Sequence, residues 1–451
     1  MPPKKIRLRN AAGAAALAAA LAALSPAACR PREGGDAAGR EVRPGDSFQP
    51  IVTALMAKWG LPGGAVGVLR DGRLAYAEGY GFADRERRRP ATPATLFRIA
   101  SLSKPITAVA VLKLVEQGRL RLDDKPFKLL DDLKPPAGAF LDPRLYDITV
   151  RDLLQHSGGF DRTASGDPMF KPTEIAWAMG APPPADPATI IRYVFTQPLD
   201  FPPGARIAYS NFGYSVLGRV IERVTGGRYR DFVREKVLAP MGIRDMRLGL
   251  TEAKFRAPGE ARYYDFPNAW LTASIFPFVR DPVAMPEGGF HLEAMDAHGG
   301  WLASAADMMR FMAWVDGRSR HRGFLRPATL ALMTARPPIA EYRDAPAYYA
   351  LGWMVRPAAG APGPDLPGAL KPAGRAAAGG GDGEADWWHT GSLSGSTSIL
   401  VRAHNGLAWV ALFNSQPADA DGFLAELDRA LWKAAEAVTS WPRRNLFNKY
   451  R

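Results

Sequence analysis

The stretch GAVGVLRDGRLAYAEGYGF, residues 64–82, contains two runs of β-forming residues that are joined at Asp71 and Gly72. Asp-Gly is a preferred pair for the tight turn of a β-hairpin, because both central positions of that turn need a positive φ. The runs on either side are rich in Val, Leu, Ala and Tyr and have the length of ordinary strands. This stretch therefore predicts an antiparallel hairpin near the start of the folded chain.

The other end of the chain has the same pattern in STSILVRAHNGLAWVALFN, residues 396–414. Here Asn405 and Gly406 separate two β-rich runs, and a helical pattern follows from Phe423 to about Trp441. Between the two hairpins lie mainly helical patterns and Pro-rich loops. We therefore expect an α+β fold with one antiparallel sheet, built from both ends of the chain and covered by helices, and a mainly helical lobe inserted between those ends.

The composition is that of a folded protein. The chain has 451 residues, of which 47% are hydrophobic, and this is enough for at least one large core. Its formal net charge of +13 comes largely from basic clusters near both ends and from a run at residues 85–89. The body of the chain has no basic stripe interleaved with aromatic residues, so nucleic-acid binding is not expected.

The N-terminus has the pattern of an export signal. Basic residues precede the apolar run AAGAAALAAALAAL at 11–24, which is short for a membrane span but fits the apolar region of a signal peptide. The single cysteine, Cys29, follows SPAA, where a bacterial lipoprotein is cleaved and lipidated; a plain secretory peptide cut near Ala28 is the alternative. Either interpretation predicts an exported, periplasmic or cell-envelope protein, with Cys29 as the candidate lipidation site and membrane tether.

Composition also predicts the boundaries along the chain. We expect a signal peptide at 1–28, a flexible tether rich in Gly, Pro and charge at 29–47, and one folded domain at 48–440. Within the domain, residues 357–385 are dominated by Pro, Gly and Ala, which predicts a mobile surface insertion. The basic segment WPRRNLFNKYR, residues 441–451, is expected to be a frayed C-terminal tail, with contact to anionic lipid as the alternative.

The stretch IASLSKPIT places Ser101 and Lys104 three positions apart, just before a run that is apolar on nearly all sides. Such a run predicts a buried helix, and residues at i and i+3 lie on one face of it. The lysine amine is therefore expected within hydrogen-bonding reach of the serine hydroxyl, an arrangement that activates a nucleophile. A single S-x-x-K also fits an ordinary helix start, in which the serine caps the helix and the lysine is solvated.

Two further motifs follow in order: Tyr209-x-Asn211 before an amphipathic helix, and His389-Thr390-Gly391 at the start of strand-like sequence. With the serine–lysine pair, they resemble the three active-site motifs of the serine β-lactamase and penicillin-binding protein superfamily. The closest resemblance is to the class C-like branch, which includes D-alanyl-D-alanine carboxypeptidases, D-aminopeptidases and esterases. Flanking stretches such as ITVRDLLQHSGGFD and HGGWLASAADMMRF also resemble this branch.

The resemblance implies a role for each matched residue. Ser101 is the expected acylated nucleophile, and either Lys104 or Tyr209 is the expected base, with the Lys104 cation supporting a Tyr209 phenolate. Asn211 is expected to hydrogen-bond the acyl side chain of the substrate. The backbone N–H groups of Ser101 and Ser392 are expected to form the oxyanion hole.

The third motif departs from the pattern of many penicillin-recognising enzymes, which carry lysine where this chain has His389. Histidine is expected to be only partly charged at neutral pH, so this residue weakens the case for an efficient β-lactamase. His389, Thr390 and Gly391 are expected to contact substrate. The prediction is an exported serine hydrolase that works through an acyl-enzyme on a D-amino-acid peptide of peptidoglycan type or a small ester. A catalytically silent wall-binding protein is the alternative.

The remaining candidates are expected to have structural roles. His156 and His298 are interpreted as packed residues near the cleft, and the histidines and lone cysteine form no metal-binding pattern, so no metal or cofactor is expected. Three aromatic residues, Trp270, Phe276 and Phe278, are candidates for the cleft wall, with core packing the favoured role. The expected partner is a small-molecule or peptidoglycan-type substrate, and no protein partner is implied.

Overall fold

The computed structural model describes four ranges of the chain: 41–266, 271–318, 323–357 and 385–450. The predicted signal peptide, Cys29 and nearly all of the predicted insertion at 357–385 lie outside the described residues. From Glu41 on, the chain forms one compact unit. Among the helices in the described ranges, none has the length and apolar character needed to cross a bilayer.

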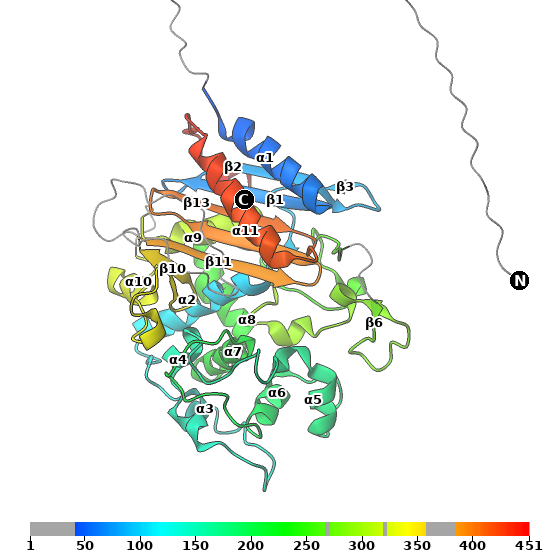
Figure 1. Cartoon of the computed structure of the whole chain (residues 1–451), viewed down its shortest axis with the longest axis vertical. Helices are drawn as coiled ribbons and strands as arrows, with labels where there is room; N and C mark the ends of the chain where they lie inside the picture. The colour runs from blue at the N-terminus through cyan, green and yellow to red at the C-terminus, as the bar shows by residue number, and fades with distance from the viewer. Residues whose placement is uncertain (1–40, 267–270, 319–322, 358–384, 451) are drawn as a thin grey trace, which may run out of the picture. The chain divides into compact units, whose positions relative to one another are not determined.

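The central element is an antiparallel sheet of eight strands, in the order β3-β2-β1-β13-β12-β11-β10-β9 (Figure 1). Strands from the two ends of the chain meet where β1 pairs with β13. The sheet predicted from both ends of the chain is therefore confirmed. The strands are β1 (Gly63–Arg70), β2 (Arg73–Asp84), β3 (Arg89–Pro90), β9 (Tyr348–Tyr349), β10 (Met354–Pro357), β11 (Ala385–Leu393), β12 (Ser396–Arg402) and β13 (Leu407–Phe413).

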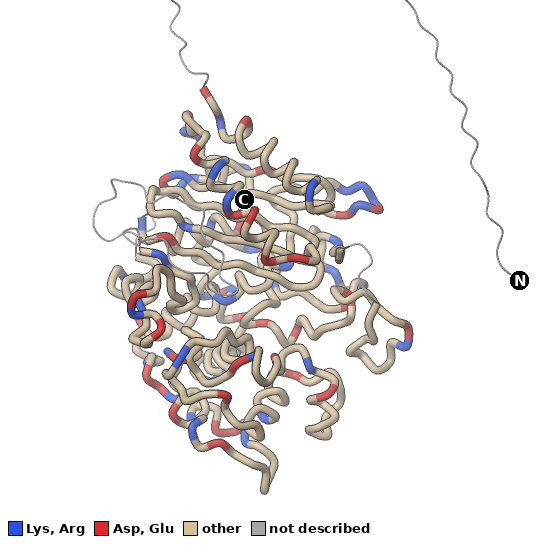
Figure 2. Tube along the Cα trace, viewed as in Figure 1, with Lys and Arg blue, Asp and Glu red and all other residues tan. Residues whose placement is uncertain are grey.

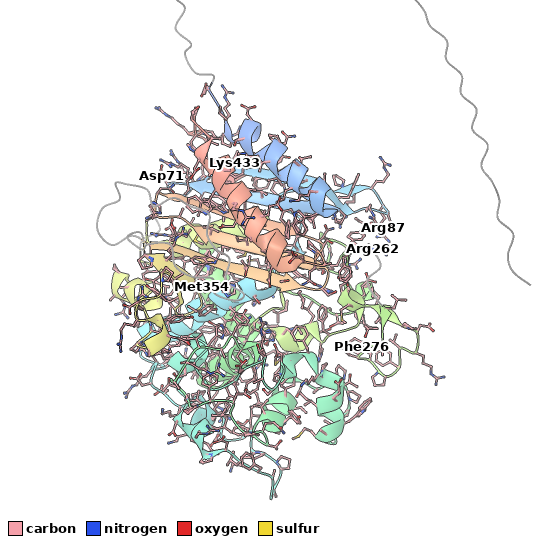
Figure 3. All side chains as sticks on the ribbon, in the orientation of Figure 1. Asp71, Arg87, Arg262, Phe276, Met354 and Lys433 are labelled. Atoms are coloured by element: carbon pink, nitrogen blue, oxygen red, sulfur yellow. The ribbon has the colours of Figure 1, made fainter. Side chains whose placement is uncertain are left out.

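Both predicted hairpins are present. Strands β1 and β2 are joined by a two-residue turn in which Asp71, labelled in Figure 3, and Gly72 have φ of 51° and 72°. Positive φ at both positions is the geometry that an Asp-Gly pair favours. The turn between β12 and β13 is closed by a hydrogen bond from Ala403 N to Leu407 O, and Gly406 has φ of 87°.

Helices cover both faces of the sheet. On the outer face, α1 (Pro44–Trp59) and α11 (Ala420–Glu436) lie side by side, whereas α2 (Ser103–Glu116) and α9 (Ala305–Val315) lie on the inner face (Figure 1). Side chains of β13 alternate between the two cores, as the period of a strand requires. The outer core receives Leu407, Trp409, Ala411 and Phe413, and the inner core receives Ala408, Val410 and Leu412.

The predicted helical lobe packs below α2, at the lower end of Figure 1. Its helices are α3 (Pro126–Leu129), α4 (Val150–Leu154), α5 (Pro172–Ala178), α6 (Pro187–Val194), α7 (Asn211–Thr225) and α8 (Tyr229–Phe232). Helix α10 (Pro327–Met333) follows α9. Two small sheets complete the fold: β4 (Phe97–Arg98), β8 (Trp301–Ala303) and β5 (Arg247–Leu248) form one, and β6 (Leu271–Thr272) and β7 (Val283–Ala284) form the other.

Regular structure begins earlier than the expected domain start at residue 48. Helix α1 starts at Pro44, whose fixed φ and missing N–H suit the first turn of a helix. The side chain of Asp46 accepts a hydrogen bond from Arg43 N at 3.3 Å, which satisfies a backbone donor at the helix start. The last residues of the expected tether are therefore part of the first helix.

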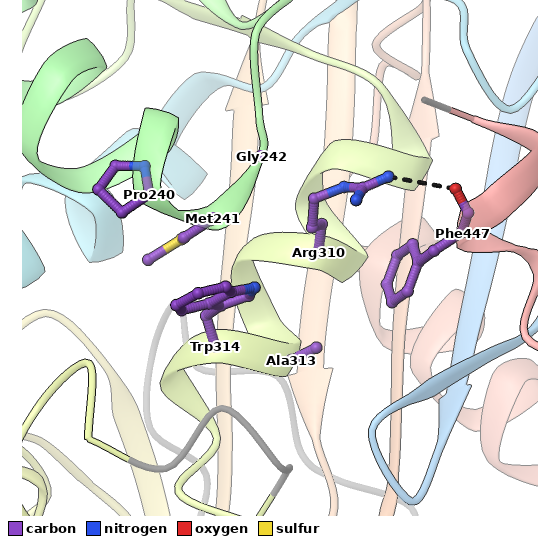
Figure 4. A pocket seen from close by; sticks show the side chains of 7 residues that line it. All are labelled: Pro240, Met241, Gly242, Arg310, Ala313, Trp314 and Phe447. Atoms are coloured by element: carbon purple, nitrogen blue, oxygen red, sulfur yellow. Dashed lines mark hydrogen bonds between the residues drawn. The ribbon is translucent and has the colours of Figure 1, made fainter.

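The end of the C-terminal segment is docked, so the expectation of a frayed tail is wrong for residues 445–450. A 3₁₀ turn spans Leu446–Lys449, and Arg310 of α9 donates to the backbone oxygens of Phe447 and Tyr450 at 3.4 and 2.8 Å (Figure 4). The Phe447 ring packs on the Arg310 guanidinium at 4.8 Å. A pocket of about 250 Å³ lies beside this contact, lined by Pro240, Met241, Gly242, Arg310, Ala313, Trp314 and Phe447.

The basic run at residues 85–89 forms the turn between β2 and β3 and the first residue of β3, visible as a blue tip in Figure 2. Much of this charge is engaged in local contacts. Arg85 packs on the Tyr264 ring, Arg89 donates to Glu260 O, and Glu86 pairs with Arg262. Figure 3 labels Arg87 and Arg262 on this side of the molecule.

Candidate active site

The candidate nucleophile Ser101 lies in a 3₁₀ turn, η1 (Ala100–Leu102), that leads directly into α2. Ala100 has φ of +46°, which is uncommon for a residue with a side chain. Neighbouring hydroxyls hold this turn in place: Ser103 Oγ donates to Ala100 O at 2.7 Å, and Ser398 Oγ of β12 donates to Ile99 O at 2.9 Å. The position of Ser101 is thus fixed by both the helix and the sheet.

Lys104 is fully buried, and its amine contacts groups from the first two motifs. Nζ lies 3.1 Å from Ser101 Oγ, 2.7 Å from Asn211 Oδ1 and 3.1 Å from the backbone oxygen of His298. It also lies 4.7 Å from the centre of the Tyr209 ring. The structure therefore brings the predicted nucleophile, both candidate bases and the predicted acyl-binding residue into one cluster.

The charge state of this cluster differs from the expected lysine–tyrosinate pair. Burial lowers the pKa of Lys104 well below its ordinary value, although the Asp167 carboxylate raises it in part. Burial also raises the pKa of Tyr209, although a hydrogen bond with Ser101 lowers it in part. The resting site therefore shifts Lys104 toward the neutral amine and keeps Tyr209 protonated, the reverse of the expected ammonium–phenolate pair.

His156 supports Tyr209 from behind, which agrees with its expected structural role. Its ring centre lies 4.3 Å from that of Tyr209 and 4.4 Å from that of Tyr349. Its Nδ1 accepts a hydrogen bond from Ser210 N at 3.2 Å, at the start of α7. Burial lowers the pKa of His156 well below its ordinary value, so the ring is neutral when it accepts this bond.

Asn211 begins helix α7, and both ends of its side-chain amide are engaged. Oδ1 accepts from Lys104, and Nδ2 donates to Asp167 Oδ2 at 2.6 Å. A second charged residue from the same loop, Arg162, lies over the Tyr209 ring at 4.8 Å. The loop that follows α4 thus places one acidic and one basic side chain beside the predicted catalytic residues.

His389 of the third motif is buried and is held on both ring nitrogens. Nδ1 lies 2.6 Å from Thr390 O, and Nε2 lies 3.0 Å from the hydroxyl of Tyr349. Burial and the nearby Lys104 lower the pKa of His389 to about 3. The expectation of a partly charged imidazole is therefore wrong: the ring is neutral at physiological pH, with a proton on Nδ1 and a lone pair for the tyrosine hydroxyl.

Strand β11 brings the third motif against η1, and this approach depends on Gly391. A Cβ at that position would lie 2.3 Å from Ser398 Oγ and 2.4 Å from Ile99 O, so no larger residue fits without a shift. Strand β10 pairs with β11 only at residues 385–388, and no strand in the described part of the chain pairs with the same edge from His389 on. Ser392 lies on this part of β11 and its hydroxyl accepts from Gln416 at 2.7 Å.

The other predicted residues have simpler environments. His298 is buried, and its backbone oxygen, rather than its ring, contacts Lys104. The expectation of core packing is wrong for Phe278, whose side chain is 70% exposed. Phe276 is half-buried on the segment between β6 and β7 (Figure 3). Trp270 lies outside the described residues. Within the four described ranges, no group of three or more His, Cys, Asp and Glu side chains has an arrangement that could hold a metal ion.

Sequence reasoning did not find three residues of this site. Asp167 and Arg162 lie on a loop without regular structure, and a single sequence gives no signal that such residues meet a helix far along the chain. Tyr349 lies on β9, and its partner His389 lies on β11, a different strand.

Residues 48–431 of the chain match the Beta-lactamase family, which is most of the folded region. The chain therefore belongs to the beta-lactamase family of serine hydrolases. Among curated proteins it is similar to the mitochondrial serine beta-lactamase-like protein LACTB of Mus musculus, with 25% identity over 385 residues that cover 69% of this chain and 66% of that protein. It is also similar to esterase EstB of Burkholderia gladioli, with 31% identity over 295 residues that cover 59% of this chain and 68% of that protein.

A third relative is protein flp of Staphylococcus aureus (strain MW2), 27% identical over 249 residues that cover 51% of this chain and 47% of that protein. The chain thus spans between about half and two thirds of the lengths of these relatives. Among solved structures, the D-amino acid amidase of Ochrobactrum anthropi SV3 superposes with a TM-score of 0.64 at 23% identity, covering 87% of this chain and 99% of that chain. This likeness supports the fold.

Proposed function

We propose that this protein is an exported serine hydrolase that cleaves an amide or ester through an acyl-enzyme on Ser101. The observation that carries the proposal is the position of Lys104 Nζ, 3.1 Å from Ser101 Oγ and hydrogen-bonded to two further oxygens. A neutral amine has two N–H groups and one lone pair. With both N–H groups donated to Asn211 Oδ1 and His298 O, the lone pair remains for the serine proton.

The reaction would then proceed in two halves. Ser101 Oγ attacks the substrate carbonyl carbon while its proton moves to Lys104 Nζ, and the negative charge that develops on the carbonyl oxygen is stabilised by the N–H groups of Ser101 and Ser392. The leaving group takes a proton, either from Lys104 directly or through the Tyr209 hydroxyl, and departs. A water molecule then attacks the acyl-enzyme by the same route in reverse and releases the acid.

The neutral third motif favours substrates without a carboxylate at that position. A lysine there would offer a permanent cation, whereas both nitrogens of His389 are already engaged with Thr390 and Tyr349. Binding a carboxylate next to a neutral, buried ring leaves that charge unpaired, which is costly. We therefore favour uncharged esters and amides over penicillins and over peptides with a free carboxylate. The similarity to an esterase and to a D-amino acid amidase supports the same choice.

The first test is the intact mass of the purified protein after exposure to a fluorophosphonate, beside Ser101→Ala. One adduct on the parent, and none on the alanine variant with an unchanged circular dichroism spectrum, would establish an activated serine. The same two proteins are then assayed with p-nitrophenyl butyrate, D-phenylalanine amide and benzylpenicillin, and we expect turnover of at least one of the first two. No adduct on a folded parent would favour the silent wall-binding protein instead.

The export proposal rests on the basic and apolar pattern of residues 1–28 and is tested separately. The full chain is expressed in a bacterial host, and the N-terminal peptide of the mature protein is read by mass spectrometry. Cleavage before a lipid-modified Cys29 supports a lipoprotein, and cleavage near Ala28 without lipid supports a secreted protein. An intact N-terminus in the cytoplasmic fraction would overturn the export proposal.

A further inference from the structure

Asp167 is a charged residue at the active site that none of the three motifs includes. It lies half-buried on the loop before the 3₁₀ turn η3 (Pro168–Phe170). Both carboxylate oxygens are engaged: Oδ1 accepts from Met169 N at 3.0 Å, and Oδ2 accepts from Asn211 Nδ2 at 2.6 Å. The first bond anchors the carboxylate to its own loop, and the second joins that loop to the start of helix α7.

The bond to Asn211 determines which way the asparagine amide faces. The side-chain amide of Asn211 lies between the Lys104 amine, on its Oδ1 side, and the Asp167 carboxylate, on its Nδ2 side. If the amide turned over, its N–H groups would face the N–H groups of Lys104 and its oxygen would face the carboxylate. Both contacts would be repulsive, so the two neighbours allow a single orientation.

We infer that Asp167 is a positioning residue of the active site, which fixes the Asn211 amide and through it holds the Lys104 amine against Ser101. This inference rests on the proposed function of Ser101 and Lys104. It also has a consequence for substrate binding. Because Nδ2 gives one N–H to Asp167 and Oδ1 is taken by Lys104, Asn211 has one N–H left for a substrate. The substrate group that meets Asn211 is therefore an acceptor, such as a carbonyl oxygen.

Asp167 also acts on the cluster through its charge, which gives a readout that a purely structural role lacks. The charged side chains that face Lys104 are Asp167, which raises the pKa of the lysine, and Arg162, which lowers it. The titratable rings around the amine are Tyr209, Tyr214, His156, His298 and His389, all of which burial favours in the uncharged form. Removing the Asp167 charge therefore leaves Arg162 unopposed.

The experiment compares the pH dependence of kcat/KM for p-nitrophenyl butyrate in the parent and in Asp167→Asn. The asparagine carries no charge and keeps a single oxygen, which can accept from Asn211 Nδ2 or from Met169 N but not from both. The base must be deprotonated to accept the serine proton, so activity rises with pH through the pKa of the base. Loss of a negative charge lowers that pKa, and we expect the acid limb to move to lower pH by roughly one unit.

We also expect kcat/KM on the high-pH plateau to fall about tenfold in Asp167→Asn, because a charge-assisted hydrogen bond becomes a neutral one. The direction of the shift is the same if Tyr209 is the base, since the Asp167 carboxylate raises its pKa as well. Asp167→Ala removes both bonds and is expected to lose about a hundredfold on the plateau. Its thermal unfolding is recorded to show that the variant is folded.

The matched control is Asp186→Asn. Asp186 also caps the start of a helix in the same lobe, where its Oδ1 accepts from Thr189 N at 2.7 Å. This hydrogen bond lies outside the cluster around Lys104. Its pH profile should equal that of the parent. A shifted acid limb in Asp167→Asn but not in Asp186→Asn supports the positioning role.

Two outcomes overturn the inference. In the first outcome, the parent forms the fluorophosphonate adduct and Asp167→Asn keeps the parental acid limb, whether or not its plateau falls. The charge of Asp167 then does not affect the pKa of the base, so the inference about Asp167 is wrong while the proposed function is still supported. If the folded parent forms no adduct at all, the proposed function and the role of Asp167 fall together.

Discussion

Strand β11 carries two buried polar clusters, one on each face of the sheet. Asp386 points toward the outer core beside α11, and His389 points toward the active site, as the alternation of a strand requires. Asp386 binds Arg356 and accepts from both His404 N and His404 Nδ1 at 2.8 Å. The outer cluster therefore pairs its charges, whereas Lys104 in the inner cluster contacts only uncharged acceptors.

The two clusters respond to burial in opposite ways. Burial alone would raise the pKa of Asp386, but Arg356 and His404 outweigh it and hold that pKa below its ordinary value. In the inner cluster, burial prevails and shifts Lys104 and His389 toward their neutral forms. Removing one partner of a buried ion pair leaves an uncompensated charge and destabilises the fold, whereas a buried neutral amine has a lone pair that can accept a proton. The comparison predicts that mutations in the inner cluster affect activity and those in the outer cluster affect stability.

The largest effect is expected for Lys104→Met, which keeps the volume of the side chain and removes the amine. Acylation of Ser101 should slow by roughly 10²- to 10⁴-fold, the usual contribution of a general base. The free energy of unfolding should fall by only about 1–2 kcal/mol, since Asn211 Oδ1 and His298 O lose a donor. Stopped-flow labelling by a fluorophosphonate and urea unfolding measure the two quantities. Acylation at the parental rate would remove Lys104 from the mechanism.

The reverse result is expected for Asp386→Asn. Arg356 would keep its charge and lose the carboxylate that it binds, and we expect the free energy of unfolding to fall by about 3 kcal/mol. The kcat/KM for an ester should stay within about twofold of the parent, because the change lies on the opposite face of β11. Urea unfolding at pH 7 measures the change in the free energy of unfolding. A loss of activity as large as that of Lys104→Met would show that the two faces are coupled.

Asp428, on α11, gives the outer cluster a dependence on pH. Burial raises its pKa to about 7, so between about pH 4 and pH 7 the folded protein keeps a proton that the unfolded chain has lost. Stability contributed by this group is therefore lost as pH rises through that window. Asp428→Asn should be about 4 kcal/mol more stable than the parent at pH 8 and equal to it at pH 4. Equal stabilities at both pH values would place the pKa of Asp428 near its ordinary value.

The smallest effect is expected for Tyr349→Phe, which removes the hydroxyl from His389 Nε2. A buried ring nitrogen without its partner should lower kcat/KM about fivefold. The matched control is Tyr348→Phe, whose lost hydroxyl bonds Thr334 O instead of the site, at 2.9 Å. Steady-state kinetics with p-nitrophenyl butyrate distinguish the two. The same loss in both variants would indicate a general packing effect.

Local geometry explains which parts of this molecule the sequence predicts. The Asp71-Gly72 turn depends on backbone preferences of two residues, and the contact between Ser101 and Lys104 depends on helix spacing, so both can be read from a short stretch. The assembly of one sheet from both ends of the chain was expected from the hairpin signals at those ends. The clustering of the three motifs was expected only because they resemble a family, since no local rule brings Tyr209 to Ser101.

The features that were missed depend on long-range contacts or on charge states. Asp167 reaches Asn211 from a loop without any repeating pattern, and the docking of Phe447 on Arg310 needs a helix far away in the chain. The neutral state of His389 follows from its complete burial, which its sequence neighbours do not specify. The basic composition of the C-terminal segment suggested a frayed tail, and the ordinary pKa of histidine suggested a partly charged His389. Tertiary packing reversed both expectations.

The pairing of β1 with β13 makes the central sheet depend on a contact between segments that are distant in sequence. Strand β1 has one neighbour, β2, that follows it directly in the chain, whereas its other neighbour, β13, follows only after the helical lobe. Closing contacts this distant in sequence is slow, because the ends of a long loop must first find each other. The turn that carries Ser101 is held by Ser398 of β12, so an incomplete chain also lacks a support of its nucleophile. The β12–β13 hairpin thus contributes both to the closure of the sheet on β1 and to the support of the nucleophile.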